Sequence, residues 1–178
     1  RPASRGPAGT TRYHPRVETL PRALSLDLDD TLWPIWPSIE RAERALDAFL
    51  REHCPRTAQA YPIHRMRQLR EQVAAEHPHL AHDFTAQRRI SLHRAIEGAG
   101  DDPAHVDAAF EAFYAQRNAV EFYPDALDAL GRLAKRFPVA ALTNGNADLA
   151  RIGIHGHFQL VPPSGRSSAL SNAMISST

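Results

Sequence analysis

The chain has 178 residues, of which 43% are hydrophobic and 23% are charged, and its formal net charge at pH 7 is +1. This length and apolar content suit one domain, or a small core with one insertion. The balanced charge argues against a nucleic-acid partner, and no apolar run of the sequence approaches the ~18 residues that cross a bilayer. We therefore predict neither a nucleic-acid nor a membrane partner.

The N-terminal segment and the cysteine content bear on the compartment. Residues 1–20 are rich in Pro, Gly, Arg and Thr without periodicity, which predicts a disordered leader, and they contain no apolar signal core. Cys54 is the single cysteine, so no internal disulfide can form. Both features favour a cytoplasmic protein.

The first patterned segment is a short apolar run from Ala23 to Leu28, which predicts a buried parallel strand. Asp29 follows directly, at the end of the strand where open α/β sheets place their ligand sites. Alternate residues of a strand point to the same face, so Asp27 and Asp29 are expected to start on one side. There, one carboxylate can attack while the other handles a proton.

Residues 38–120 are predicted to be helical throughout. Ser38 is a candidate N-cap for the first apolar stripe, and three further stripes run through 63–73, 84–96 and 106–113. The third stripe ends at Gly98 and Gly100, and an Asp-Pro pair opens the fourth. Four helices between two strands describe a helical insertion.

Beyond residue 120 the α/β pattern returns. Pro124 begins a predicted helix, and residues 139–142 are a second buried strand that ends in Thr143, Asn144 and Gly145. Residues 158–161 are a candidate third strand. From Pro162 onward the sequence is Ser-rich and unpatterned, which predicts a disordered or aberrant tail.

These motifs resemble those of the haloacid dehalogenase superfamily. Residues 26–32, Leu-Asp-Leu-Asp-Asp-Thr-Leu, are similar to its first motif, Asp-x-Asp-x-Thr after an apolar strand. Thr143 after residues 139–142 resembles the second motif, and the helical insertion resembles the cap domain. A closer likeness, to the bacterial flavin mononucleotide phosphatases, is carried by residues 28–32, His82-Asp83 and residues 143–147. Those enzymes also act on the phosphorylated ribitylamino-uracil intermediate of riboflavin synthesis.

The resemblance implies an α/β fold, with a parallel-sheet Rossmann-like core, incomplete at the C-terminus, and an inserted four-helix cap. The expected organisation is a leader, a first core segment, the cap, a second core segment and a tail, over residues 1–20, 21–37, 38–120, 121–161 and 162–178. The expected partner is a small phosphorylated metabolite. The sequence does not fix the oligomeric state.

The resemblance also implies a phosphatase mechanism. Asp27 would be the nucleophile that forms an aspartyl-phosphate, and Asp29 the general acid. Mg²⁺ would be held by Asp27 and the Asp29 carbonyl, and the phosphoryl oxygens by the Thr143 hydroxyl and the amides of Leu28 and Asn144. The plain alternative for Asp27 is a turn carboxylate at a strand end. Asp29 disfavours a dehalogenase, because a halide leaves without a proton.

Two further motifs of the superfamily are expected after the second: a Lys or Arg, and an acidic pair that completes the metal site. After Thr143 the sequence contains neither Lys nor Glu, and its one Asp, Asp148, follows the second motif too closely. Arg151 and Arg166 lack the expected surroundings. An alternative is therefore a truncated, catalytically inactive fragment, and residues 1–178 by themselves are expected to turn over phosphate esters poorly.

Three groups of side chains have two interpretations each. A cluster of cap histidines is either a metal site or a solvated loop, and its spacing matches no common zinc pattern: His77, His79 and His82. Five cap arginines are either a solvated face balanced by Glu71 and Glu76 or a surface that attracts an anionic substrate: Arg65, Arg67, Arg70, Arg88 and Arg89. Trp33 and Trp36 either pack in the hinge between core and cap or stack on a flavin ring of the substrate. Trp33 is the candidate substrate contact of the two.

Overall fold

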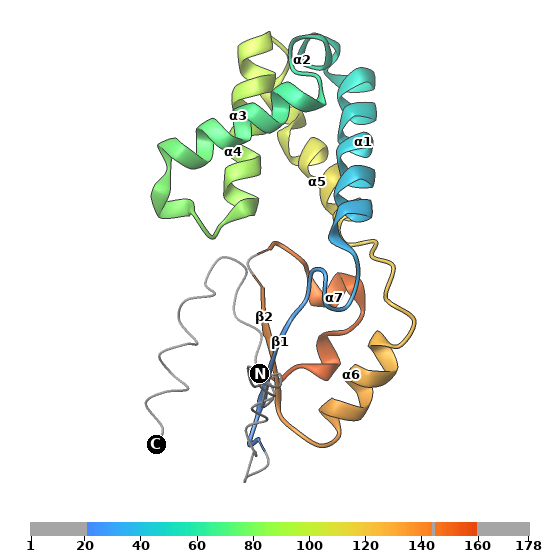
Figure 1. Cartoon of the computed structure of the whole chain (residues 1–178). Coiled ribbons are helices and arrows are strands. Elements are labelled where there is room, and N and C mark those ends of the chain that lie inside the picture. Colours follow the sequence, from blue (N-terminus) through green and yellow to red (C-terminus); the bar gives the residue numbers. More distant parts are fainter. Residues whose placement is uncertain (1–20, 144, 160–178) are drawn as a thin grey trace, which may run out of the picture.

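The computed structural model describes residues 21–143 and 145–159. The elements in chain order are β1 (Leu24–Asp27), α1 (Ile35–His53), α2 (Pro55–Ala60), α3 (Ile63–Glu76), η1 (Pro78–Leu80), α4 (Phe84–Ala99), η2 (Pro103–His105), α5 (Val106–Arg117), α6 (Ala126–Ala134), β2 (Val139–Leu142), α7 (Leu149–Ile152) and η3 (His155–His157). Helices α1–α5 form one body, and the strands with α6 and α7 form the other (Figure 1). The predicted leader and tail lie outside the described residues.

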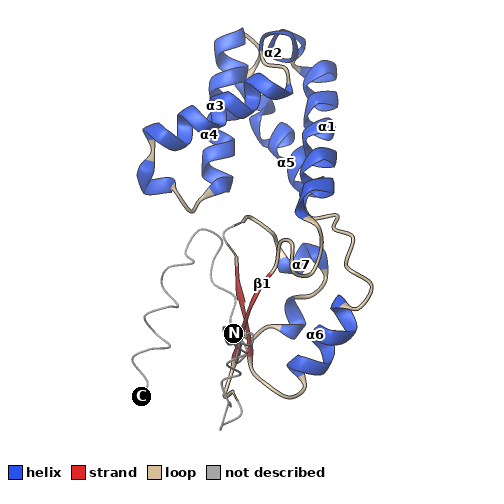
Figure 2. Cartoon of the chain, in the orientation of Figure 1, coloured by secondary structure: helices blue, strands red, loops and turns tan. Residues whose placement is uncertain are grey.

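The two strands pair in parallel although the whole helical cluster separates them in sequence (Figure 2). Their register runs from Leu24 opposite Val139 to Asp27 opposite Leu142, so both strands end side by side. Strand β2 is buried as predicted, whereas β1 is only half-buried, with Ser25 and Asp27 exposed. Within the described residues β1 has one neighbouring strand, which is why the expectation of a buried β1 was wrong.

A first hydrophobic core joins the strands to α6 and α7. Leu130 of α6, Val139 and Ala141 of β2, and Leu149 of α7 are buried together in it. The predicted helix after Pro124 is therefore present, and it begins at Ala126. Residues 158 and 159 are not in a strand, although the Gln159 amide donates to the Val139 carbonyl at 2.9 Å. Residues 160 and 161 of that predicted strand lie outside the described residues.

A second core holds the five α-helices of the insertion together, and it includes Leu46 and Leu50 of α1, Leu92 of α4 and Phe113 of α5. The four predicted helices correspond to α1, α3, α4 and α5, while the short α2 was not predicted. Helix α4 ends as expected, with Gly100 in the left-handed region at φ 80°. In the described part of the chain, no helix has both the length and the apolar character needed to cross a membrane.

The start of α1 differs from the prediction. The helix begins at Ile35, after Pro34 in an extended conformation, and Ser38 lies inside its first turns. The Ser38 side chain is buried, and its hydroxyl has no hydrogen-bond partner among the described residues. Ser38 is therefore a buried helical residue and not a cap, so the insertion leaves the strand sooner than the sequence pattern indicates.

Cys54 is completely buried between α1 and α2, and we expect it to react slowly. Burial, and then the negative charges of Asp101 and Asp102, raise the pKa of its thiol, so less thiolate is present at neutral pH. Labelling of the folded protein by a disulfide reagent should be slower than in urea by about tenfold or more, because access needs local opening. Equal rates in the two conditions would contradict this burial.

Candidate active site

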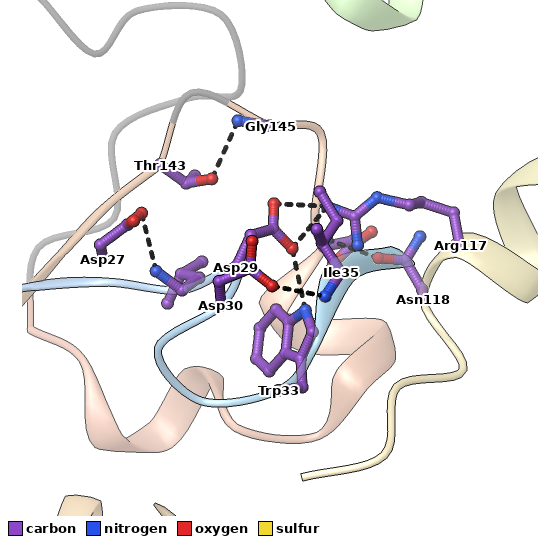
Figure 3. Close-up of polar contacts among 11 residues, drawn as sticks. Asp27, Asp29, Asp30, Trp33, Ile35, Arg117, Asn118, Thr143 and Gly145 are labelled. Carbon is purple, nitrogen blue, oxygen red and sulfur yellow. Dashed lines mark hydrogen bonds and ion pairs between the residues drawn. The ribbon is translucent and has the colours of Figure 1, made fainter. Parts of the chain in front are cut away.

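The parallel register brings the ends of the two strands together. Asp27 is the last residue of β1, Thr143 follows β2, and both line a cleft of about 430 Å³ (Figure 3). The Asp27 side chain is exposed, and one of its oxygens accepts the Leu28 amide at 2.9 Å. The Thr143 hydroxyl accepts the Gly145 amide at 3.0 Å. Asn144, expected to bind phosphate with Thr143, lies outside the described residues.

Asp29 lies beyond the strand and is held by two side chains (Figure 3). Its Oδ1 accepts the Trp33 indole N–H at 2.8 Å and an Arg117 N–H at 2.9 Å, and its Oδ2 accepts from the same Arg117 nitrogen at 2.7 Å. Arg117 is the last residue of α5 and only 1% exposed. The helical cluster thus reaches into the site and fixes the orientation of the Asp29 carboxylate.

A tight turn places Asp29 and leads into α1. Asp30 adopts a left-handed conformation at φ 58°, which Asp tolerates better than most residues. Its carboxylate accepts the Ile35 amide at 3.0 Å, and its own amide donates to the Trp33 carbonyl at 2.8 Å. These bonds close the turn, so Asp30 has a structural role at the cleft edge.

Gly145 approaches the Asp29–Arg117 pair so closely that a side chain would not fit. A Cβ there would lie 2.7 Å from Asp29 Oδ2 and 3.1 Å from the Arg117 Nη2 atom. Both atoms are fixed by their mutual hydrogen bonds and so have little freedom to move away. Glycine is therefore needed at this position for steric reasons.

Gly145→Ala should destabilise the fold by about 1–3 kcal/mol, the usual cost of overpacking. The matched control is Gly156→Ala, where an added Cβ meets no atom within 4 Å. Urea unfolding of both variants measures the difference. A Gly145→Ala protein as stable as the Gly156→Ala protein would contradict the close approach.

The oxygen donors of the site suit Mg²⁺ in type. The Asp27 carboxylate and the Asp29 backbone carbonyl are hard ligands, and Mg²⁺ is commonly held by one or two carboxylates together with water and phosphate oxygens. Over the described ranges, no cluster of three or more His, Cys, Asp or Glu side chains is placed to hold a metal. The cap histidines 77, 79 and 82 are not grouped in this way, and His79 and His82 are exposed.

The five cap arginines do not act as one surface. Arg67 binds Glu43 and Arg89 binds Asp107, whereas Arg70 and Arg88 line the cleft. The Arg88 guanidinium lies 3.4 Å from the centre of the Phe113 ring. Burial, and then the neighbouring charge of Arg70, lower the pKa of Arg88 to about 9, so the group stays cationic at pH 7.

The two tryptophans are placed differently. Trp33 is completely buried, and its ring meets Phe122 edge-on with centroids 5.6 Å apart. No surface of the ring is left for a substrate, and Trp33 instead packs in the first core, with residues of β2, α6 and α7. Trp36 is 67% exposed and does not line the cleft.

Arg117 was not identified from the sequence. It continues the spacing of Val106, Phe110 and Phe113, and so falls on the buried stripe of α5. A cation on an otherwise apolar stripe needs a buried partner, and that signal was available. Nothing in the local sequence names Asp29, 88 residues away, as the partner.

Known proteins provide an independent comparison, although no protein-family model matches the chain. The chain is 33% identical over 157 residues to the 5-amino-6-(5-phospho-D-ribitylamino)uracil phosphatase YigB of Escherichia coli (strain K12), with 84% of this chain covered. It is 35% identical to the crystal structure of a 2-haloacid dehalogenase from Pseudomonas syringae pv. Tomato DC3000, with a TM-score of 0.73. That match covers 80% of this chain.

The likeness extends over most of this chain but not over the whole of the relatives. The chain spans 66% of the length of the E. coli phosphatase and 63% of the length of the P. syringae structure. Sequence identity and fold agree with the two motifs found at Asp27 and Thr143. The chain therefore belongs to the haloacid dehalogenase superfamily.

Proposed function

We propose that the whole protein is a Mg²⁺-dependent phosphomonoester hydrolase. The observation that carries the proposal is the exposed Asp27 carboxylate at the end of β1, beside the Thr143 hydroxyl in a cleft that also contains cationic Arg70 and Arg88. A carboxylate there can attack phosphorus, while hydroxyl and guanidinium donors stabilise the phosphoryl oxygens.

The proposed reaction has two steps. Asp27 forms a bond to phosphorus as the bond to the ester oxygen breaks, and Asp29 gives a proton to the departing alcohol. Asp29 then takes a proton from the water that cleaves the aspartyl-phosphate, which releases inorganic phosphate and restores both carboxyl groups. Bound Mg²⁺ would screen the approach of the carboxylate to the phosphate.

For the substrate we propose flavin mononucleotide or the phosphorylated ribitylamino-uracil precursor of riboflavin. The similarity to the E. coli 5-amino-6-(5-phospho-D-ribitylamino)uracil phosphatase and the motif likeness support this class. Phosphate release should be fastest, by kcat/KM, for these two compounds in a panel with glucose 6-phosphate and adenosine monophosphate. A clear preference for glucose 6-phosphate, with flavin mononucleotide untouched, would contradict the substrate class but not the reaction class.

Removal of the metal should abolish turnover. Treatment with a chelator is expected to lower phosphatase activity by about a hundredfold or more, and added Mg²⁺ should restore it, because two anions must meet at phosphorus. The measurement is phosphate release before and after Mg²⁺ is returned. Full activity in excess chelator would rule out the metal requirement.

Two alternatives to a phosphatase, a dehalogenase and a catalytically inactive fragment, can be distinguished by their products. The P. syringae neighbour is a 2-haloacid dehalogenase, so halide release from a 2-chloro acid should be measured beside phosphate release. Halide release without phosphate release would favour that chemistry. If neither product forms, the inactive-fragment alternative is favoured.

Because Cys54 is the one cysteine in the sequence, we also propose a cytoplasmic location.

A further inference from the structure

Most arginines of the helical cluster have an acidic partner. Arg41 pairs with Glu121, Arg67 with Glu43, Arg89 with Asp107 and Arg94 with Glu76. Arg70 and Arg88 differ, because no carboxylate of the described residues lies within ion-pair distance of either. Both side chains line the cleft that contains Asp27.

The positive charge of Arg70 and Arg88 is offset only in part, because the carboxylates that line the same cavities form no ion pair with either of them. Arg88 packs over the Phe113 ring, and the nearby charges of Arg70 and Arg117 add repulsion to its desolvation. Glu43 is the acid that favours the charged form of Arg88, but both Glu43 oxygens already accept from Arg67, at 2.9 and 3.1 Å from Nε. Cations held this way favour an incoming anion.

The two arginines come from the opposite side of the cleft to the nucleophile. Arg70 lies on α3 and Arg88 on α4, and these helices belong to the body that faces the carboxyl ends of β1 and β2 (Figure 1). The same cleft is also lined by the apolar side chains of Ile35, Ile39 and Phe84. A molecule with its phosphoryl group at Asp27 would therefore present its other end toward Arg70 and Arg88.

We infer that Arg70 and Arg88 form a second binding site, whose guanidinium groups donate hydrogen bonds to an oxygen-rich group at the end of the substrate remote from the phosphoryl group. The inference rests on the proposed function for the placement of the phosphoryl group. The chemistry is that of guanidinium donors: a carboxylate or second phosphate, or the carbonyl edge of a ring. Compounds with an apolar remote end should bind more weakly.

Three phosphonates that cannot be hydrolysed test the inference: 4-phosphonobutyrate, its carboxamide and butylphosphonate. Titration calorimetry with Mg²⁺ present should show 4-phosphonobutyrate binding about tenfold more tightly than butylphosphonate. Two variants, Arg70→Met and Arg88→Met, should each reduce the ratio of the Kd of butylphosphonate to the Kd of 4-phosphonobutyrate. Methionine at position 88 keeps an apolar chain over Phe113. Arg65→Met is the matched control, because Arg65 lies on α3 outside the cleft and should leave the ratio unchanged.

The carboxamide identifies the source of the preference. If the carboxamide binds as tightly as 4-phosphonobutyrate, the site recognises a carbonyl oxygen. If the carboxamide binds more weakly, the site recognises a negative charge. Equal binding of all three compounds to the unchanged protein, absence of binding, or a ratio that survives both substitutions would overturn the second site. Binding of phosphonates does not depend on turnover. If the unchanged protein prefers 4-phosphonobutyrate but hydrolyses no phosphate ester, the proposed function is contradicted and the second site is not.

Discussion

Replacing Arg117 by Met is expected to destabilise the protein by about 3–5 kcal/mol, the usual cost of removing one partner from a buried ion pair. Arg117 is 1% exposed and provides two of the three hydrogen bonds that hold the Asp29 carboxylate. Its loss leaves Asp29 with the Trp33 indole alone and removes a link between α5 and the β1 turn. Urea unfolding measures the change. Arg89→Met is the matched control, since its exposed pair with Asp107 should contribute about 0–1 kcal/mol.

The same substitution should impair catalysis through Asp29. Arg117 acts as a positioning residue, and a misplaced proton donor costs on the order of a hundredfold in kcat. The loss should be larger for an alkyl phosphate than for p-nitrophenyl phosphate, because nitrophenolate leaves without a proton. Arg117→Lys should recover part of kcat. An equal loss for both esters at a temperature where the variant is folded would show that Arg117 is only structural.

The placement of Asp27 and Thr143 at the same edge of the sheet could be predicted from the sequence. Two short apolar runs, each ending in polar residues, indicate parallel strands, and parallel strands that pair end at one edge of the sheet. The register of Asp27 opposite Leu142 fulfils this expectation. The helical insertion was equally clear, because its apolar spacing is that of helices over some eighty residues.

The ion pairs that join different elements of the fold could not be predicted. Arg67 and Arg70 lie one turn apart on α3, yet Arg67 meets Glu43 of α1 while Arg70 faces the cleft. The partners of Arg67, Arg89 and Arg94 each lie on another helix, so the choice depends on how the helices pack and not on local spacing. For the same reason the need for glycine at position 145 is visible only once Asp29 and Arg117 are placed.

Asp27→Asn is expected to lower phosphate release by on the order of 10³-fold or more, because an amide cannot attack phosphorus. The variant should fold, since Asp27 is exposed and an Asn oxygen can still accept the Leu28 amide. Asp30→Asn is the matched control: Asn tolerates the left-handed backbone of Asp30 and can accept the Ile35 amide.

The direct test of the central claim is kcat for p-nitrophenyl phosphate with saturating Mg²⁺, measured in the whole protein and in both variants. The account predicts near-complete loss of turnover in Asp27→Asn and activity close to that of the unchanged protein in Asp30→Asn. Turnover by Asp27→Asn at a rate near that of the unchanged protein would contradict the assignment of Asp27 as the nucleophile.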